Sequence, residues 1–168
     1  MSTLFVMCGL PGSGKSTFLK NISKTYPNVE VISRDEIRFS LTKEDEQYFA
    51  HEDAVRKTLY EKINLALSKG KDVFVDQTSL NPGSRRLLLT SIHGYTACKA
   101  IVMDIGIKTC LERNKMRAGT RAYVPEYIIY NMAKSFRKPS IQEGFSNIFT
   151  IKEGEKFNND LLFIWPTF

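Results

Sequence analysis

The stretch that most constrains this chain is Gly-Leu-Pro-Gly-Ser-Gly-Lys-Ser, residues 9–16. It follows a short apolar run, residues 3–8, of the kind that fills a buried parallel strand. It leads into residues 15–26, where Phe18, Leu19 and Ile22 recur at helical spacing. Glycines at such a junction let backbone N–H groups curl around an anion, and the helix adds its positive N-terminal end. The stretch therefore predicts a strand, an anion-binding loop and a helix, in that order.

The spacing of this loop is G-x-x-x-x-G-K-[ST], the pattern of the P-loop that cradles nucleotide phosphates. Lys15 is expected to act in catalysis through its charge on the β- and γ-phosphates, and Ser16 to bind Mg²⁺ through its hydroxyl. The expected ATP-binding residues of the loop are Gly9, Gly12, Ser13, Gly14, Lys15, Ser16 and Thr17. A P-loop alone does not distinguish a kinase from a GTPase or a motor. However, the chain is short for a motor and has no guanine-reading N-K-x-D.

Beyond the loop, apolar strand-like runs alternate with helical patterns, which predicts an α/β sandwich with a mainly parallel sheet. Strands are expected at residues 3–8, 29–33, 72–76 and 97–105, and helices at residues 15–26, 35–41, 46–69, 82–92, 107–119 and 125–138. Residues 147–151 and 161–165 are expected to form final strands or an edge hairpin. With no linker or repeat in between, residues 1–168 are expected to form one domain.

Ligands of parallel sheets bind at the carboxyl ends of the strands. Four separate segments should meet there: residues 9–16, Asp35, residues 76–78 and the region after Ile105. At the second of these, Ser33 and Glu36 have capping-box spacing, so Asp35 is not needed as the cap. Asp35 and Arg38 then either form an ordinary ion pair within the helix or hold a substrate.

Candidate residues for the far side of the site follow the third strand. Asp76 ends a buried strand beside the P-loop and must have a partner, and it also fits a carboxylate associated with Mg²⁺. Thr78 fits either a turn or a substrate contact, whereas Asn81 fits the cap of the next helix, with Pro82 at its first position. The pair at residues 85–86 is expected on that helix's surface.

Three arginines, Arg113, Arg117 and Arg121, recur every four residues near a glycine-containing loop. They fit a solvated helix face, or an arginine-bearing helical lid over residues 111–124. Phosphoryl transfer needs guanidinium groups where charge accumulates on the transferring group. We therefore expect Arg113 and Arg117 to act on the ATP phosphates.

The composition is that of a globular protein with 42% apolar and 25% charged residues, and its net charge of +6 favours a polyanionic partner. No apolar run is long enough to cross a membrane and no export leader is evident, so a cytoplasmic location is expected. The three cysteines are too few and too scattered for a disulfide framework. The tyrosines Tyr123, Tyr127 and Tyr130 could stack bases, but Tyr127 and Tyr130 fit packing within a helix better. Trp165 is expected to pack at an edge, and His51 and His93 to lie on the surface or to pack on a helix.

Four motifs in matching order resemble the 5′-hydroxyl kinase module of polynucleotide kinases, within the P-loop phosphotransferases. They are GLPGSGKST, SRDEIR, TSLNP followed by Arg-Arg, and RNKMRAGTRAYVP, spread over residues 3–138. The resemblance implies a three-layer P-loop kinase fold. It also implies that Asp35 is the general base, that Arg38 contacts a 3′-phosphate on the acceptor, and that Thr78 lies near that phosphate. The resemblance also implies a carboxylate directly before this threonine, on the acceptor side of the site. Here Gln77 stands in that place and the acid, Asp76, comes one residue earlier, so Asp76 is expected to bind the acceptor beside Arg38.

The function expected from these features is Mg²⁺- and ATP-dependent phosphorylation of 5′-hydroxyl ends of DNA or RNA. The alternatives are a P-loop kinase of a nucleoside, sugar or antibiotic, and a nucleotide-binding module without turnover. D-x-D-G-T and K-x-D-G motifs are absent from the sequence, so neither a phosphatase nor a ligase activity is expected beside the kinase.

Overall fold

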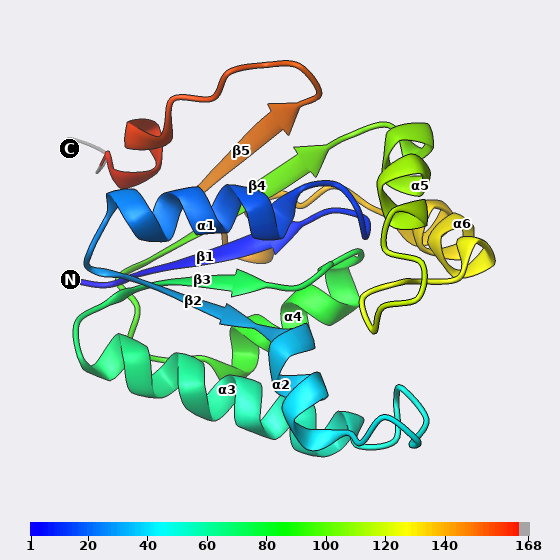
Figure 1. Ribbon diagram of the computed structural model, residues 1–168. Coiled ribbons are helices and arrows are strands. Elements are labelled where there is room, and N and C mark those ends of the chain that lie inside the picture. Colours follow the sequence, from blue (N-terminus) through cyan, green and yellow to red (C-terminus); the bar gives the residue numbers. More distant parts are fainter. Residues whose placement is uncertain (165–168) are drawn as a thin grey trace.

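A five-stranded parallel sheet forms the centre of the computed structural model, which describes residues 1–164 (Figure 1). The strand order is β2–β3–β1–β4–β5, and each neighbouring pair is parallel. The strands are β1 (Thr3–Cys8), β2 (Val29–Ser33), β3 (Asp72–Asp76), β4 (Ala97–Asp104) and β5 (Asn147–Lys152). The predicted α/β fold is confirmed, and the sheet is wholly rather than mainly parallel.

Alternating side chains of β1 serve the two faces of this sheet. Phe5 and Met7 pack under α1 (Lys15–Thr25) and the 3₁₀ helix η2 (Asn159–Phe163). Leu4 and Val6 face the opposite layer, formed by α3 (Glu52–Ser68) and α4 (Pro82–Ser91). Because β1 is buried on both faces, its sequence is a continuous apolar run without alternation. The result is three layers, with helices above and below the sheet (Figure 1).

Near the carboxyl ends of the strands lie α2 (Arg34–Leu41), α5 (Ile107–Lys115) and α6 (Glu126–Ser135) (Figure 1). The 3₁₀ helix η1 (Ile141–Glu143) precedes β5 and packs against α4. Ser33 caps α2 by accepting a hydrogen bond from the Glu36 N–H at 3.3 Å, and Asn81 caps α4 through the Ser84 N–H at 3.0 Å. Both expected caps are confirmed. These caps fix where α2 and α4 leave the sheet.

Several predicted boundaries were wrong. The helix expected from residue 46 begins at Glu52, because the Glu46 carboxylate instead accepts from the Lys43 N–H at 2.8 Å and contacts His51 at 3.0 Å within a series of turns. The helix expected to reach residue 119 ends at Lys115, and the helix expected over residues 125–138 is confined to Glu126–Ser135. The segment expected to form the lid, residues 111–124, therefore consists of the end of α5 followed by an irregular loop.

The carboxyl-terminal prediction was half correct. β5 is a strand, but it pairs in parallel with β4 and so cannot belong to a hairpin. The next apolar residues form η2 instead of a strand, because the buried Lys99 ammonium binds the carbonyls of Leu162 at 2.6 Å and Ile164 at 3.1 Å. Trp165 lies outside the described residues.

Two expectations about exposure were also wrong. Arg85, expected on a helix surface, is fully buried, whereas its neighbour Arg86 is exposed as expected. Tyr127 and Tyr130, expected to pack in a helix, are 67% and 47% exposed. Among the described residues, no helix has both the length and the apolar character needed to cross a bilayer.

Candidate active site

The P-loop joins β1 to α1 and takes its shape from two glycines in the left-handed region, Gly12 at φ +80° and Gly14 at φ +93°. A Cβ at Gly12 would lie 2.5 Å from the carbonyl oxygen of Cys110, so only glycine lets the loop approach α5 this closely. The Gly9 N–H donates to the Thr78 carbonyl at 3.0 Å. The loop is therefore held from both sides, by α5 and by the segment after β3.

Lys15, the first residue of α1, folds back over the loop. Its ammonium donates to the carbonyls of Gly9 and Leu10, both at 2.9 Å. Burial lowers the pKa of this lysine, while the charges of Asp76 and Asp35 oppose the change. The ammonium is satisfied by backbone oxygens that phosphate oxygens can replace, because these are stronger acceptors for a charged donor.

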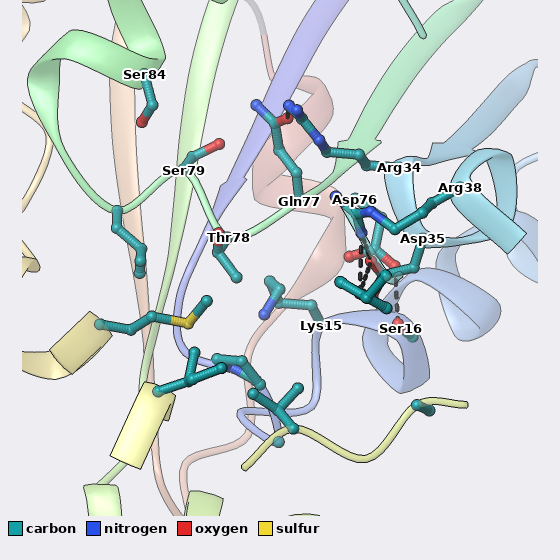
Figure 2. Close-up of a pocket in the computed structure, with 18 of the residues that line it drawn as sticks. Lys15, Ser16, Arg34, Asp35, Arg38, Asp76, Gln77, Thr78, Ser79 and Ser84 are labelled. Atoms are coloured by element: carbon teal, nitrogen blue, oxygen red, sulfur yellow. Dashed lines mark hydrogen bonds and ion pairs between the residues drawn. The ribbon is translucent and has the colours of Figure 1, made fainter. Parts of the chain in front are cut away.

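Ser16 and Asp76 connect α1 to the end of β3. The Ser16 hydroxyl donates to Asp76 Oδ2 at 2.7 Å, and both groups face the hollow around Lys15 (Figure 2). Burial raises the pKa of Asp76, against the effects of the serine hydrogen bond and the Lys15 charge. The donor set is a hydroxyl and a carboxylate, the hard oxygen ligands that Mg²⁺ selects. The partner that Asp76 was expected to need is thus Ser16.

Asp35 and Arg38 form an ion pair on one face of α2, which is the first of the two alternatives that the sequence left open. Arg38 is much more than a surface partner, because its side chain is only 7% exposed whereas that of Asp35 is 62% exposed. Glu52 binds Arg38 in bidentate fashion, at 2.6 Å to Nε and 3.1 Å to Nη2. Tyr48 accepts from Arg38 at 2.9 Å and donates to Asp35 at 3.0 Å. Asp35 is thereby held from one side, with much of its carboxylate open to solvent.

This network alters the acid–base properties of its members. Burial and the Asp35 charge raise the pKa of Tyr48 to about 12, so the phenol stays a proton donor to the carboxylate. Burial alone would raise the pKa of Glu52, but hydrogen bonds from Arg38 and Arg34 lower it. Glu52 is therefore the anionic anchor of both arginines, whereas the sequence suggested Asp35 and Asp76 as the carboxylates beside Arg38.

A cavity of about 610 Å³ joins these groups. Lys15, Ser16, Asp35, Arg38 and Thr78 all line it. Figure 2 shows Asp35 and Arg38 on the same side of Lys15 as Ser16, and Thr78 on the other side. Three of the four segments expected to converge do so. The fourth, after β4, contributes through α5, whose Cys110 carbonyl packs on the P-loop.

The segment expected to form the lid, residues 111–124, borders this cavity and is attached to the rest of the protein through Arg113 and Arg121. Arg113 donates to the Gly12 carbonyl at 3.3 Å, and Arg117 lines the cavity. Asn114, fully buried, exchanges two hydrogen bonds with the backbone of Val124, at 2.7 and 3.0 Å. Arg121 crosses to the end of α2 and binds the Phe39 and Thr42 carbonyls at 3.3 and 2.7 Å.

Sequence reasoning missed Tyr48, Glu52 and Asn114. Glu52 was concealed within a helical pattern expected to start six residues earlier, and Tyr48 lies in the turns before it. The need of Arg38 for a carboxylate partner was a usable signal, but the partner, Glu52, belongs to a different helix. Asn114 lay within the arginine-rich helix, where a polar residue is unremarkable in sequence.

A parallel sheet with this strand order, a P-loop after its central strand and an arginine-bearing lid define the P-loop kinase class of α/β folds. Residues 4–139 match the family described as AAA domain, and the chain belongs to that family. The solved Pnkp1/Rnl/Hen1 RNA repair complex contains a chain with this fold, at a TM-score of 0.70 and 21% identity over 80% of this chain and 43% of that one. At that identity the match shows the fold alone.

Two curated viral relatives bear on the resemblance found in the motifs. A protein of Acanthamoeba polyphaga mimivirus, named as a bifunctional polynucleotide phosphatase/kinase, is 35% identical over 88% of this chain and 32% of its own length. One of Autographa californica nuclear polyhedrosis virus, named as a bifunctional polynucleotide kinase/RNA ligase, is 30% identical over 95% of this chain and 24% of its own. The resemblance to a polynucleotide kinase module is confirmed. The chain spans about a third and about a quarter of these relatives.

Proposed function

We propose that this chain transfers the γ-phosphate of ATP to the 5′-hydroxyl end of DNA or RNA. The observation that carries the proposal is that Lys15 and the exposed carboxylate of Asp35 line the same cavity. A triphosphate held by the P-loop and a hydroxyl beside Asp35 would meet inside it. The names of the two viral relatives support a polynucleotide as the acceptor.

On the donor side, the P-loop amides would bind the β-phosphate and Lys15 would move from its carbonyl partners to the β- and γ-phosphates. Arg113 and Arg117 of the lid would neutralise the charge that develops on the transferring phosphoryl. Their attachment to the P-loop and cavity supports these roles. Lid closure would also exclude water, which limits hydrolysis of ATP.

Ser16 and Asp76 would hold Mg²⁺, which supplies charge neutralisation across the β- and γ-phosphates when bound. Their hydrogen bond at 2.7 Å supports a shared ligand site for a hard cation. We therefore assign Asp76 to the metal side of the reaction, instead of the acceptor side expected from the resemblance. Residues 1–168 would then be one kinase domain, and the free, buried cysteines fit a cytoplasmic location.

On the acceptor side, Asp35 would accept the proton of the 5′-hydroxyl as it attacks the γ-phosphorus. Arg38 would contact the phosphate 3′ to that nucleoside, with Thr78 nearby. Four of the five N–H donors of Arg38 are used by Glu52, Asp35 and Tyr48, so the acceptor phosphate would bind the remaining Nη2 proton or displace Asp35 from Nη1. Displacement would leave the carboxylate free for the hydroxyl.

The test is transfer of label from γ-labelled ATP to a panel of acceptors: 5′-hydroxyl DNA and RNA oligonucleotides, a 3′-phosphorylated nucleoside, and free nucleosides and sugars. We expect labelled oligonucleotides and 3′-phosphorylated nucleoside, and little label on free sugars or nucleosides. Label only on the free small molecules would support a small-molecule kinase, which has the same fold and P-loop. Label on nothing, with ATP still bound, would indicate a module without turnover.

A further inference from the structure

Two aromatic side chains lie at the mouth of the cavity without being buried. Tyr48 is 38% exposed and Phe49 is 57% exposed, and both line the same cavity as Asp35. Their rings meet edge to face with centroids 4.7 Å apart. We call this pair the aromatic rim. Single exposed apolar residues are common, but a pair of ordered rings at a cavity mouth is a typical ligand surface.

The rim is held in place by the catalytic network. The Tyr48 hydroxyl is hydrogen-bonded to both Arg38 and Asp35, and these two bonds fix the orientation of its ring. The Arg38 guanidinium lies 4.6 Å from the centre of the Tyr48 ring and 5.5 Å from that of Phe49. The side chain of Phe49 has no polar atom to satisfy, and the residue is more exposed than Tyr48. The rim is therefore a preformed apolar surface beside a cation.

We propose that the aromatic rim is a stacking platform for a nucleobase at the 5′ end of the acceptor strand. This proposal rests on the polynucleotide acceptor proposed above. In it the aromatic rim contacts a base of the acceptor, whereas Arg38 contacts its phosphate. Aromatic rings bind the face of any base, which makes such a contact tolerant of sequence. The cations Arg34 and Arg56 line the same cavity, where the backbone of a bound strand would need them.

The short distance between the aromatic rim and Arg38 limits which base of the acceptor can stack on the rim. The phosphate assigned to Arg38 joins the first and second nucleotides, and both rings of the rim lie within 5.5 Å of that guanidinium. The stacked base must therefore belong to nucleotide 1 or nucleotide 2. Bases further along the strand lie beyond the rim.

The first experiment measures steady-state kinetics of Phe49→Ala with a single-stranded 5′-hydroxyl oligonucleotide. We expect the acceptor KM to rise between about 5-fold and 100-fold, as loss of one base–aromatic stack implies. The kcat and the KM for ATP should stay within about twofold, because Phe49 touches no reacting group. Phe49→Trp should restore the acceptor KM. Tyr127→Ala, at an exposed ring outside the cavity, is the matched control and should change nothing.

The second experiment places single abasic sites at nucleotides 1, 2 and 6 of the acceptor. Loss of the stacked base should raise the wild-type KM and abolish the effect of Phe49→Ala at nucleotide 1 or 2, but not at 6. The proposal is overturned if Phe49→Ala leaves the KM unchanged, or if its effect is equal on all three abasic acceptors. In either case a wild-type enzyme that labels oligonucleotides leaves the proposed function intact. A wild-type enzyme that labels none overturns both.

Discussion

Arg85 offers the sharpest test of how the fold supports the site. Its guanidinium is fully buried and binds Glu143 at 2.6 and 2.8 Å through Nε and Nη2. Its Nη1 also donates to the carbonyls of Ser79 and Arg137, each at 2.9 Å. One side chain thus ties the loop after β3, which lines the cavity, to the segment after α6. Ser79, a non-glycine residue at φ +45°, depends on this support.

The substitution Arg85→Met keeps most of the aliphatic stem and removes every one of these donors. Glu143, whose side chain is 16% exposed, would be left without its cation. Removal of one partner of a buried ion pair typically costs about 3–5 kcal/mol of unfolding free energy. At about 2–4 °C per kcal/mol for a chain of this size, the Tm should fall by roughly 6–20 °C. The neighbouring Arg86→Met removes the same group from an exposed position and should change stability by less than about 0.5 kcal/mol.

Urea unfolding as a function of pH measures this difference and its cause. The hydrogen bond from Arg85 lowers the pKa of Glu143 below its ordinary 4.5. The stabilisation is therefore present above that ordinary pKa and is lost as the pH falls through the lower, folded-state pKa. The gap between wild type and Arg85→Met should narrow on acidification below about pH 4.5. A gap no larger than that of Arg86→Met, or one that widens in acid, would refute the reasoning.

Three further changes test separate parts of the site. Gly12→Ala brings a Cβ to 2.5 Å from the Cys110 carbonyl oxygen at a positive φ, so calorimetry should show an unfolding free energy lower by about 2–5 kcal/mol. The control Gly119→Ala has the same φ but open space around it, and should lower the unfolding free energy by about 1–2 kcal/mol. Equal losses would contradict the close approach of the P-loop to α5. Asp76→Asn should raise the Mg²⁺ concentration for half-maximal transfer about 10–100-fold, and an unchanged Mg²⁺ titration would remove Asp76 from the metal site. Arg121→Ala should speed amide hydrogen exchange in the lid, and unchanged exchange would show that its contacts with α2 do not hold the lid.

Much of the fold could be predicted because its signals are local. The run at residues 3–8 is apolar throughout since both faces of β1 are buried, and Asn81 and Pro82 mark the start of α4 through their own backbone chemistry. The expected convergence of loops followed from parallel strands alone. These features depend on neighbours in sequence, or on the topology that alternating strands and helices impose.

The errors arose where distant contacts override local pattern. In the sequence Arg85 resembles its surface neighbour Arg86, because its buried partner Glu143 lies 58 residues away along the chain. Glu52 neutralises Arg38 from the next helix, and no spacing rule connects them. The carboxyl-terminal apolar run forms η2 because Lys99 of β4 binds its carbonyls.

The central claim is that Asp35 accepts the proton of the acceptor hydroxyl inside the cavity in which Lys15 holds the triphosphate. Single-turnover transfer of γ-phosphate to a 5′-hydroxyl oligonucleotide by Asp35→Asn, measured beside ATP affinity, tests it most directly. We predict a transfer rate reduced by about 10²–10⁴-fold, as for loss of a general base, with ATP affinity within about twofold of wild type. A rate within about tenfold of wild type, or a parallel loss of ATP binding, would contradict the assignment of Asp35 as the base.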